Sequence, residues 1–306
     1  MPSFDIAGRA KIWFTISLIV IIAGLGLMAT RGLNFGIDFT GGTIIDLKFE
    51  QPTEISKVRD ALKPFGLDNS TIQLSGDASD VSSSTDVMIR TIDMEETQRK
   101  EVMAAIRSEV GNYEVMREEK VGATIGKELI LNAVMALAIS WVLIILYITY
   151  RFSEWHFGFA AVVALIHDVL IVLTFFSLTQ RQIDSSFVAA LLTVVGYSIN
   201  DTIVIFDRIR ENLKLHFRRG GNLFKLLNLS VYQTLTRSLY TVFTCLFTTL
   251  ALFFFGGETT KDFAFALIVG FSAGCYSSIF IAGPLWLTFR NMAEKKRKRK
   301  PAKVEE

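Results

Sequence analysis

The sequence predicts a polytopic α-helical membrane protein with six transmembrane helices and one inserted α+β domain. Of its 306 residues, 51% are hydrophobic and 25 are Phe. The apolar residues gather in six blocks, each near the ~20 residues that cross a bilayer, and the charges lie between the blocks. Cys245 and Cys275 both lie inside apolar blocks, so we expect buried thiols rather than a disulfide framework.

The apolar blocks set the order of segments along the chain. A short segment, residues 1–11, precedes the first span, and residues 290–306 follow the last. The predicted spans cover residues 12–30, 128–149, 157–178, 185–206, 237–256 and 263–289. The sixth is long enough to tilt, and Pro284 predicts a kink within it.

Lysine and arginine are distributed unevenly between the two sides. An even number of spans places both ends on one side, together with the loop at residues 207–236 and the basic tail at 290–306. The opposite short loops hold only Arg181 and Lys261. The positive-inside rule therefore predicts that both termini are cytoplasmic. The basic tail is interpreted as a topology signal at the anionic lipid bilayer, and no nucleic-acid partner is expected.

The sequence pattern of the cytoplasmic loop, residues 207–236, predicts secondary structure within the loop. It reads as an extension of the fourth span, a turn at Gly220 and Gly221, and then an amphipathic helix. The apolar residues of that helix recur near helical spacing at Leu223, Leu226, Leu227 and Val231. This pattern is typical of an in-plane helix at the membrane surface.

The segment at residues 31–127 is polar and lies on the outer, periplasmic side in this topology. Strands are predicted at residues 43–50, 71–75, 87–92 and 113–121. Helices are predicted at 53–65, with Thr53 as N-cap, and at 94–110, and residues 76–86 form a loop. The order βαββαβ predicts a ferredoxin-like domain.

Ionisable residues inside the spans are the candidates for function. A charged group deep in a membrane costs about 2.5–3.5 kcal/mol on insertion scales, so it usually has a use. His167 and Asp168 lie at the middle of the third span, Asp201 lies in the fourth, and Arg237 lies at the mouth of the fifth. A carboxylate whose Arg partner comes and goes with conformation is a proton-coupling device. A static hydrogen bond or ion pair that fixes helix packing is the alternative at each position.

Small and polar residues predict helix contacts. Gly270 and Gly274 form a GxxxG pattern, and Gly196 lies four residues before Asn200. The glycines at residues 36–42 precede a strand rather than a helix, which argues against a phosphate-binding loop. No CxxC, HExxH, Walker or GxSxG pattern occurs, so we expect no cofactor, no metal and no hydrolytic active site.

Four motifs together resemble the SecD/SecF protein-export family over nearly the whole chain. They are LNFGIDFTGGT at residues 33–43, ALIHDV at 164–169, VVGYSINDTIVIFDRIREN at 194–212 and QTLTRS at 233–238. The resemblance implies a bacterial inner-membrane protein that pairs with SecD and associates with the SecY-SecE-SecG channel and YajC. It also implies that Asp201 is the proton-relay carboxylate and that Arg237 faces it, with His167 and Asp168 in a motif of unassigned role.

The resemblance implies use of the proton gradient to pull or release unfolded preproteins at the outer side. We therefore hypothesise that protonation of Asp201 switches helix packing and moves the outer domain. Two alternatives remain open on the residues alone. One is a scaffold subunit in which Asp201 and Arg237 tolerate neutral substitution, and the other is a proton-coupled small-molecule exporter.

Overall fold

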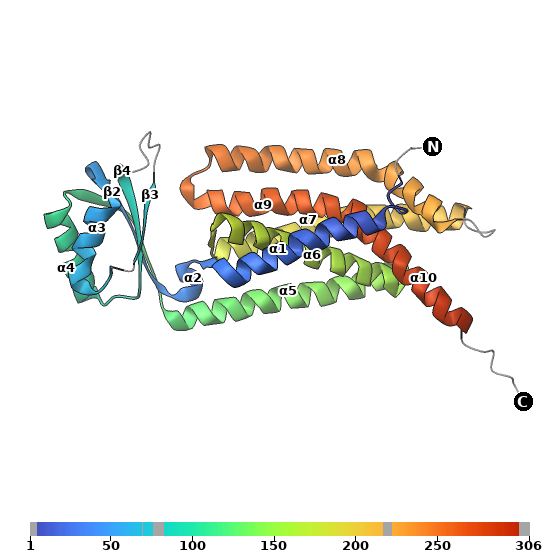
Figure 1. The fold of residues 1–306 in the computed structure, drawn as a ribbon, viewed down its shortest axis with the longest axis horizontal. Helices are drawn as coiled ribbons and strands as arrows, with labels where there is room; N and C mark the ends of the chain where they lie inside the picture. Colours follow the sequence, from blue (N-terminus) through green and yellow to red (C-terminus); the bar gives the residue numbers. More distant parts are fainter. Residues whose placement is uncertain (1–4, 69, 76–82, 217–221, 300–306) are drawn as a thin grey trace, which may run out of the picture. The chain divides into compact units, whose positions relative to one another are not determined.

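The structure is a computed structural model that describes residues 5–68, 70–75, 83–216 and 222–299 (Figure 1). The chain divides into two compact units. Phe35–Val134 forms the inserted unit, and Met1–Asn34 together with Met135–Glu306 forms the helical unit. The inserted unit thus begins and ends a few residues later than the predicted segment 31–127.

The inserted unit is a four-stranded antiparallel sheet with two helices. Its sheet runs in the order β3-β4-β2-β5, and every neighbouring pair is antiparallel. This is the strand order of the ferredoxin-like fold that the βαββαβ pattern predicts. Its elements are α2 (Ile37–Thr40), β2 (Gly42–Glu54), α3 (Ile55–Leu62) with a 3-10 turn (Lys63–Phe65), β3 (Thr71–Ser75), β4 (Ser83–Thr91), α4 (Glu96–Glu109) and β5 (Tyr113–Val121).

The core of the inserted unit lies between the sheet and helices α3 and α4. Alternate residues of β2 point into it, including Ile45 and Leu47, because successive strand side chains face opposite sides. Helix α3 contributes Val58 and Leu62, and α4 contributes Ile106, all fully buried. The sheet face that bears Asp46 lies on the other side of β2 and is less buried.

Two predicted boundaries in the inserted unit are wrong. Thr53 is not a helix cap, because β2 continues to Glu54 and Thr53 lies opposite Ser84 of β4. Helix α3 begins at Ile55, after Glu54, which makes no side-chain capping bond. Strand β4 begins at Ser83, so residues 83–86 of the predicted loop belong to the sheet, and residues 76–82 lie outside the described residues.

Six helical segments of the described chain are long and apolar enough to cross a membrane. They are α1 (Ala10–Arg31), α5 (Ala123–Phe152), α6 (Trp155–Thr179), α7 (Ser185–His216), α8 (Leu223–Phe255) and the sixth span, which comprises α9 (Glu258–Ser277), a π-helical segment (Ser278–Ala282) and α10 (Gly283–Arg299). Two-residue strands β1 (Asn34–Phe35) and β6 (Gln182–Ile183) complete the described elements. The six-helix architecture with an inserted α+β domain is therefore confirmed.

Helix α6 is the centre of the helical unit. It contacts α1, α7, α9 and α10, whereas α8 packs on α7 and α9. Apolar side chains of α5, such as Leu143 and Leu146, are exposed, as suits a helix that faces lipid. In the sixth span, α10 leaves the direction of α9 (Figure 1) just after the π-helical segment and at Pro284, the predicted kink.

The predicted in-plane amphipathic helix is instead the first part of α8. Asn222 caps α8, since its side-chain oxygen accepts hydrogen bonds from the backbone N–H groups of Phe224 and Lys225. The apolar face is buried within the protein rather than in lipid: Leu227 and Val231 are fully buried. The predicted turn at Gly220 and Gly221 lies outside the described residues.

Candidate functional site

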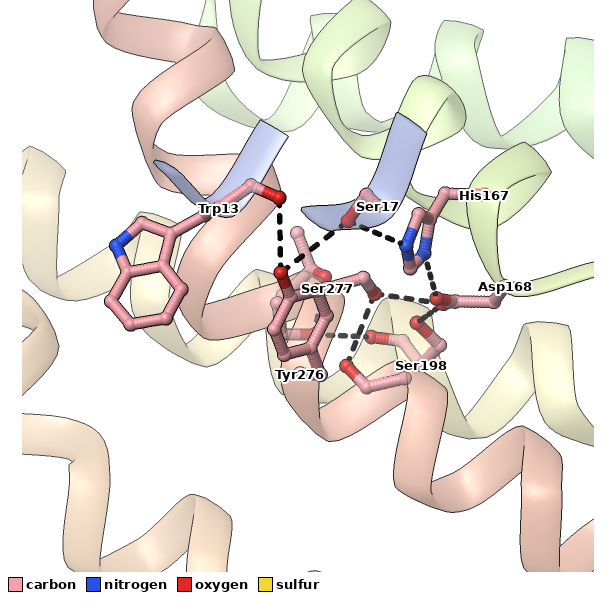
Figure 2. Close-up of polar contacts among 10 residues, drawn as sticks. Trp13, Ser17, His167, Asp168, Ser198, Tyr276 and Ser277 are labelled. Atoms are coloured by element: carbon pink, nitrogen blue, oxygen red, sulfur yellow. Dashed lines mark hydrogen bonds and ion pairs between the residues drawn. The ribbon is translucent and has the colours of Figure 1, made fainter. Parts of the chain in front are cut away.

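A buried polar cluster joins four helices inside the helical unit (Figure 2). Its centre is the Asp168 carboxylate on α6, which is 1% exposed. One oxygen, Oδ2, accepts hydrogen bonds from Ser198 Oγ of α7 at 2.6 Å and from Ser277 Oγ of α9 at 2.8 Å. The other, Oδ1, lies 3.0 Å from His167 Nδ1. Both oxygens of this carboxylate are therefore engaged.

The cluster continues from His167 to helix α1. His167 Nε2 lies 3.1 Å from Ser17 Oγ, and Ser17 Oγ donates to Tyr276 Oη at 3.4 Å. Tyr276 Oη in turn donates to the backbone oxygen of Trp13 at 3.1 Å. The His167 ring also stacks on the Tyr276 ring, with 5.9 Å between centroids. The sequence pair His167-Asp168 thus links α1, α6, α7 and α9 in one network.

The donors and acceptors of the network limit the positions that its protons can occupy. Ser17 has one hydroxyl proton, and when it is directed at Tyr276 the oxygen of Ser17 accepts from His167 Nε2–H. The Nδ1–Asp168 contact then holds either a proton on His167 with Asp168 ionised, or a proton on Asp168 with His167 neutral. One proton is therefore shared between two buried groups.

Asp201 lies in a second polar site, between α7 and α8, and its environment differs from that of Asp168. Its Oδ1 accepts a hydrogen bond from Ser238 Oγ of α8 at 2.6 Å, and the residue is 7% exposed. Its Oδ2 is buried without a hydrogen-bond partner among the described residues. A buried acceptor without a partner is costly, and a proton on this oxygen would remove that cost.

The sixth span connects the two sites. Ser277 contacts Asp168, while the next residue, Ser278, lies 2.8 Å from Thr202 Oγ1, beside Asp201 in the chain. Ser278 Oγ also donates to the backbone oxygen of Ser198 at 3.4 Å. The π-helical segment begins at Ser278, and such segments occur frequently at functional sites. Of these two consecutive serines, Ser277 therefore bonds to the Asp168 carboxylate, and Ser278 bonds to Thr202, next to Asp201.

Arg237 does not pair with Asp201 in this structure. Its side chain is exposed, and the neighbouring Ser238 contacts the carboxylate instead. Over the described part of the chain, no Lys, Arg or His nitrogen forms an ion pair with Asp201 within 4.0 Å. The facing Arg that the family resemblance implies thus stays a prediction for another conformation or assembly.

The predicted packing glycines separate into two groups. A Cβ on Gly270 would overlap the Val194 side chain, and one on Gly274 would approach Ser198 Cβ to 3.0 Å, so both lie where α9 packs closely on α7. A Cβ on Gly196 would meet no atom within 4 Å, and Asn200 is exposed. Both residues are exposed in this chain, so their role in helix packing stays a prediction.

Sequence reasoning missed the hydroxyl groups of the site. Ser17, Ser198, Ser238, Ser277 and Ser278 are each 7% exposed or less. The signal that would have found them is that serine is polar and yet recurs inside apolar spans, where it must bond to another polar group. The described residues hold no group of three or more His, Cys, Asp or Glu side chains placed to bind a metal. Cys245 and Cys275 are free thiols.

Comparisons with known proteins agree with the motifs. A family described as "Protein export membrane protein SecD/SecF, C-terminal" matches residues 101–292, and the "SecD/SecF GG Motif" matches residues 26–53. The chain is 52% identical over 290 residues to the protein translocase subunit SecF of Acidaminococcus fermentans, covering 95% of this chain and 98% of that one. It is 38% identical to the SecF subunit of Calditerrivibrio nitroreducens, covering 96% of both chains.

Solved structures of SecDF are also similar. The crystal structure of SecDF, a translocon-associated membrane protein from Thermus thermophilus, is 37% identical with a TM-score of 0.83 and covers 95% of this chain. SecDF in its super-membrane-facing form is 36% identical with a TM-score of 0.71 and covers 97% of this chain. The chain spans 39% and 40% of the length of those two SecDF chains.

Proposed function

Because the chain belongs to the SecD/SecF family of protein-export membrane proteins, we propose that it acts as an accessory subunit of the Sec translocase. It is a multi-pass membrane protein, and the proposed location is the bacterial inner membrane with both termini in the cytoplasm. Its role is to assist export of unfolded preproteins at a late stage, on the periplasmic side. The observation that carries the proton-dependent part of this role is the buried, half-satisfied carboxylate of Asp201.

The proposed partner is SecD. The SecDF chains that resemble this protein are about two and a half times as long, which supports a functional unit larger than six spans. In that assembly the exposed face of α7, with Gly196 and Asn200, contacts the partner subunit. The assembly works with the SecY-SecE-SecG channel and YajC, and the preprotein meets it on the outer side.

The proposed energy source is the proton gradient. Proton binding at Asp201 Oδ2 neutralises the carboxylate and adds a donor to a site that holds one bond, from Ser238. The α7–α8 contact then differs between the two protonation states. One charge that crosses 100 mV supplies about 2.3 kcal/mol, so a few protons bias a sizeable domain motion.

Asp168 and His167 have a second role in this proposal. Their network holds α1, α6, α7 and α9 together. Ser278 contacts α7 next to Asp201 and Ser277 contacts Asp168, so a movement of α7 at Asp201 also moves the network. The full set of bonds at Asp168 equally supports the scaffold alternative, in which polar residues only fix helix packing. The two functions differ in their dependence on the charge of Asp201.

The test measures preprotein translocation into inverted membrane vesicles, with and without a proton gradient. Asp201→Asn keeps an acceptor for Ser238 and removes the ionisable group. We expect it to abolish the gradient-dependent part of late translocation, while copurification with SecD stays intact. Glu211→Gln is the matched control, because it removes a carboxylate of the same helix that lies on the surface and pairs with Arg208.

Full gradient-dependent stimulation in the Asp201→Asn vesicles would contradict the proton-coupled role and leave the scaffold function. Loss of SecD from the purified Asp201→Asn complex would also contradict it, because the residue would then act in assembly. Extrusion of small molecules that depends on Asp201, with translocation unchanged, would favour the exporter alternative.

A further inference from the structure

A cavity of about 340 Å³ lies at one end of the helical unit. It is formed where α5 ends, α6 begins and α7 ends, beside α10 of the sixth span. Its lining residues are Phe152, Ser153, Glu154, Arg210, Leu213, Lys214 and Arg290. By connectivity this is the end of the helical unit at which α1 begins and α10 ends, the side that holds the basic residues Arg9 and Lys11. Neither Asp201 nor Asp168 lines the cavity.

Three cationic side chains from two helices meet at this cavity. Arg210 and Lys214 are one helical turn apart on α7, and Arg290 comes from α10. Among the described lining residues Glu154 is the one carboxylate, and its Oε1 lies 3.7 Å from Arg290 Nη1, which is a loose pair. The lining therefore holds three cations and one carboxylate, and Asp207 beside Arg210 and Glu294 beside Arg290 offset part of the positive charge.

The guanidinium groups are held in place by other contacts. Arg210 donates to the backbone oxygen of Arg151 at 3.0 Å and pairs with Asp207 at 3.1 Å, and its guanidinium lies over the Phe152 ring. The Arg290 guanidinium lies over the Trp286 ring at 5.5 Å, and its Nε lies 3.6 Å from Glu294 Oε1. Cations fixed in this way lose little side-chain freedom when an anion binds, which favours binding.

The backbone at the rim of the cavity is strained. Ser153, in the two-residue connection between α5 and α6, has φ of 57°, which is in the left-handed region that disfavours residues other than glycine. This conformation lets α5 end at Phe152 and α6 begin at Trp155, so that Phe152 and Glu154 both line the cavity. Strain of this kind is concentrated at binding sites and switch regions.

The neighbouring aromatic residues indicate the depth of the cavity in the membrane. Tyr150 is 87% exposed and Trp155 is 50% exposed, on either side of the lining residues 152–154. Exposed Tyr and Trp are enriched at the headgroup level of a bilayer. The lining also pairs charged groups with the apolar Phe152 and Leu213. A ligand with an anionic head and an apolar body fits both features.

We propose that this cavity binds the phosphate headgroup of an anionic phospholipid, with Arg210, Lys214 and Arg290 around the phosphate. Basic pockets between transmembrane helices are known to hold such headgroups on the cytoplasmic side. Glu154 weakens the site by repulsion and sets its affinity. The proposal is independent of proton coupling, because the site shares no residue with Asp201 or Asp168.

The experiment uses the full chain purified in detergent and measures bound phosphatidylglycerol by native mass spectrometry. At about 1 kcal/mol for each cation near a phosphate, Lys214→Gln should weaken binding ~5-fold. Lys214 is exposed, so its replacement leaves the fold intact. Glu154→Gln should tighten binding by a similar factor, an effect that lost packing does not produce. Lys225→Gln is the matched control, since Lys225 is exposed and lies outside the cavity.

Two comparison ligands separate the sources of phosphate. Phosphatidylethanolamine should bind more weakly than phosphatidylglycerol, and millimolar inorganic phosphate should leave the bound lipid in place. Equal lipid binding in wild type, Lys214→Gln and Glu154→Gln would overturn the proposal. Displacement of the lipid by inorganic phosphate would also overturn it, because the site would then bind a soluble anion.

Discussion

Replacement of Asp168 tests whether the buried network holds the helices together. Asp168→Ala removes the acceptor for His167, Ser198 and Ser277 at once. Asp168→Asn keeps all three contacts. Its oxygen takes the place of Oδ2 and accepts from both serines, and its amide donates to His167 Nδ1 when the ring proton is on Nε2.

The expected loss follows from the number of bonds. Hydrogen bonds between transmembrane helices are worth about 0.6 kcal/mol on average and up to about 1.7 kcal/mol. Three of them give roughly 2–5 kcal/mol for Asp168→Ala. Asp168→Asn should cost less than ~1 kcal/mol, because each donor keeps a partner.

The assay is the free energy of unfolding of the full chain in bicelles, measured by steric trapping, with wild type and both variants under the same conditions. A loss below ~0.5 kcal/mol for Asp168→Ala is less than one average hydrogen bond, and it would refute the idea that the Asp168 network holds the helices together. Equal losses for Asp168→Ala and Asp168→Asn would also refute it, since the charge rather than the bonds would then matter. Gradient-dependent translocation by Asp168→Asn then decides whether Asp168 also carries a proton.

Further predictions concern helix packing and the inserted unit. Gly270→Ala should destabilise the chain by about 1–3 kcal/mol in the same unfolding assay, because the added methyl overlaps the fully buried Val194. Gly196→Ala, with open space around it, should be neutral or stabilising, and the reverse order would contradict the α7–α9 packing. Leu62→Ala should raise hydrogen exchange in β2 and β3, since α3 contacts these strands, Leu62 is fully buried, and such truncations cost about 2–5 kcal/mol. In β2, burial raises the pKa of the Asp46 carboxyl, an effect that Arg117 and Arg90 partly offset and Glu119 reinforces. The folded state therefore holds this proton more tightly than the unfolded chain, so stability falls as pH rises from the unfolded pKa to the folded pKa. Asp46→Asn should remove that part of the pH dependence and increase protection of β2 from exchange at neutral pH, and an unchanged pH profile would contradict it.

The architecture of the chain can be predicted from its amino-acid sequence. Long apolar blocks such as 12–30 can satisfy their backbone in lipid only as helices, so composition alone predicts the six helical spans. The order of strands and helices in the inserted segment was also readable, because residues such as Ile45 and Leu47 alternate with polar ones. The position of Asp168 and Asp201 inside spans marked them as candidates, since charge in a membrane is costly.

The contacts of these residues depend on how the helices pack in three dimensions. The partners of Asp168 and His167 come from positions 17, 198 and 277, and no local pattern links residues that far apart. Boundaries shifted for the same reason: pairing with β4 extends β2 past Thr53, and burial against neighbouring helices turns the amphipathic segment into the start of α8. The choice of Ser238 rather than Arg237 as the contact of Asp201 depends on the rotation of α8 about its axis. That rotation is set by packing of the whole helix, because adjacent residues of a helix point in directions about 100° apart.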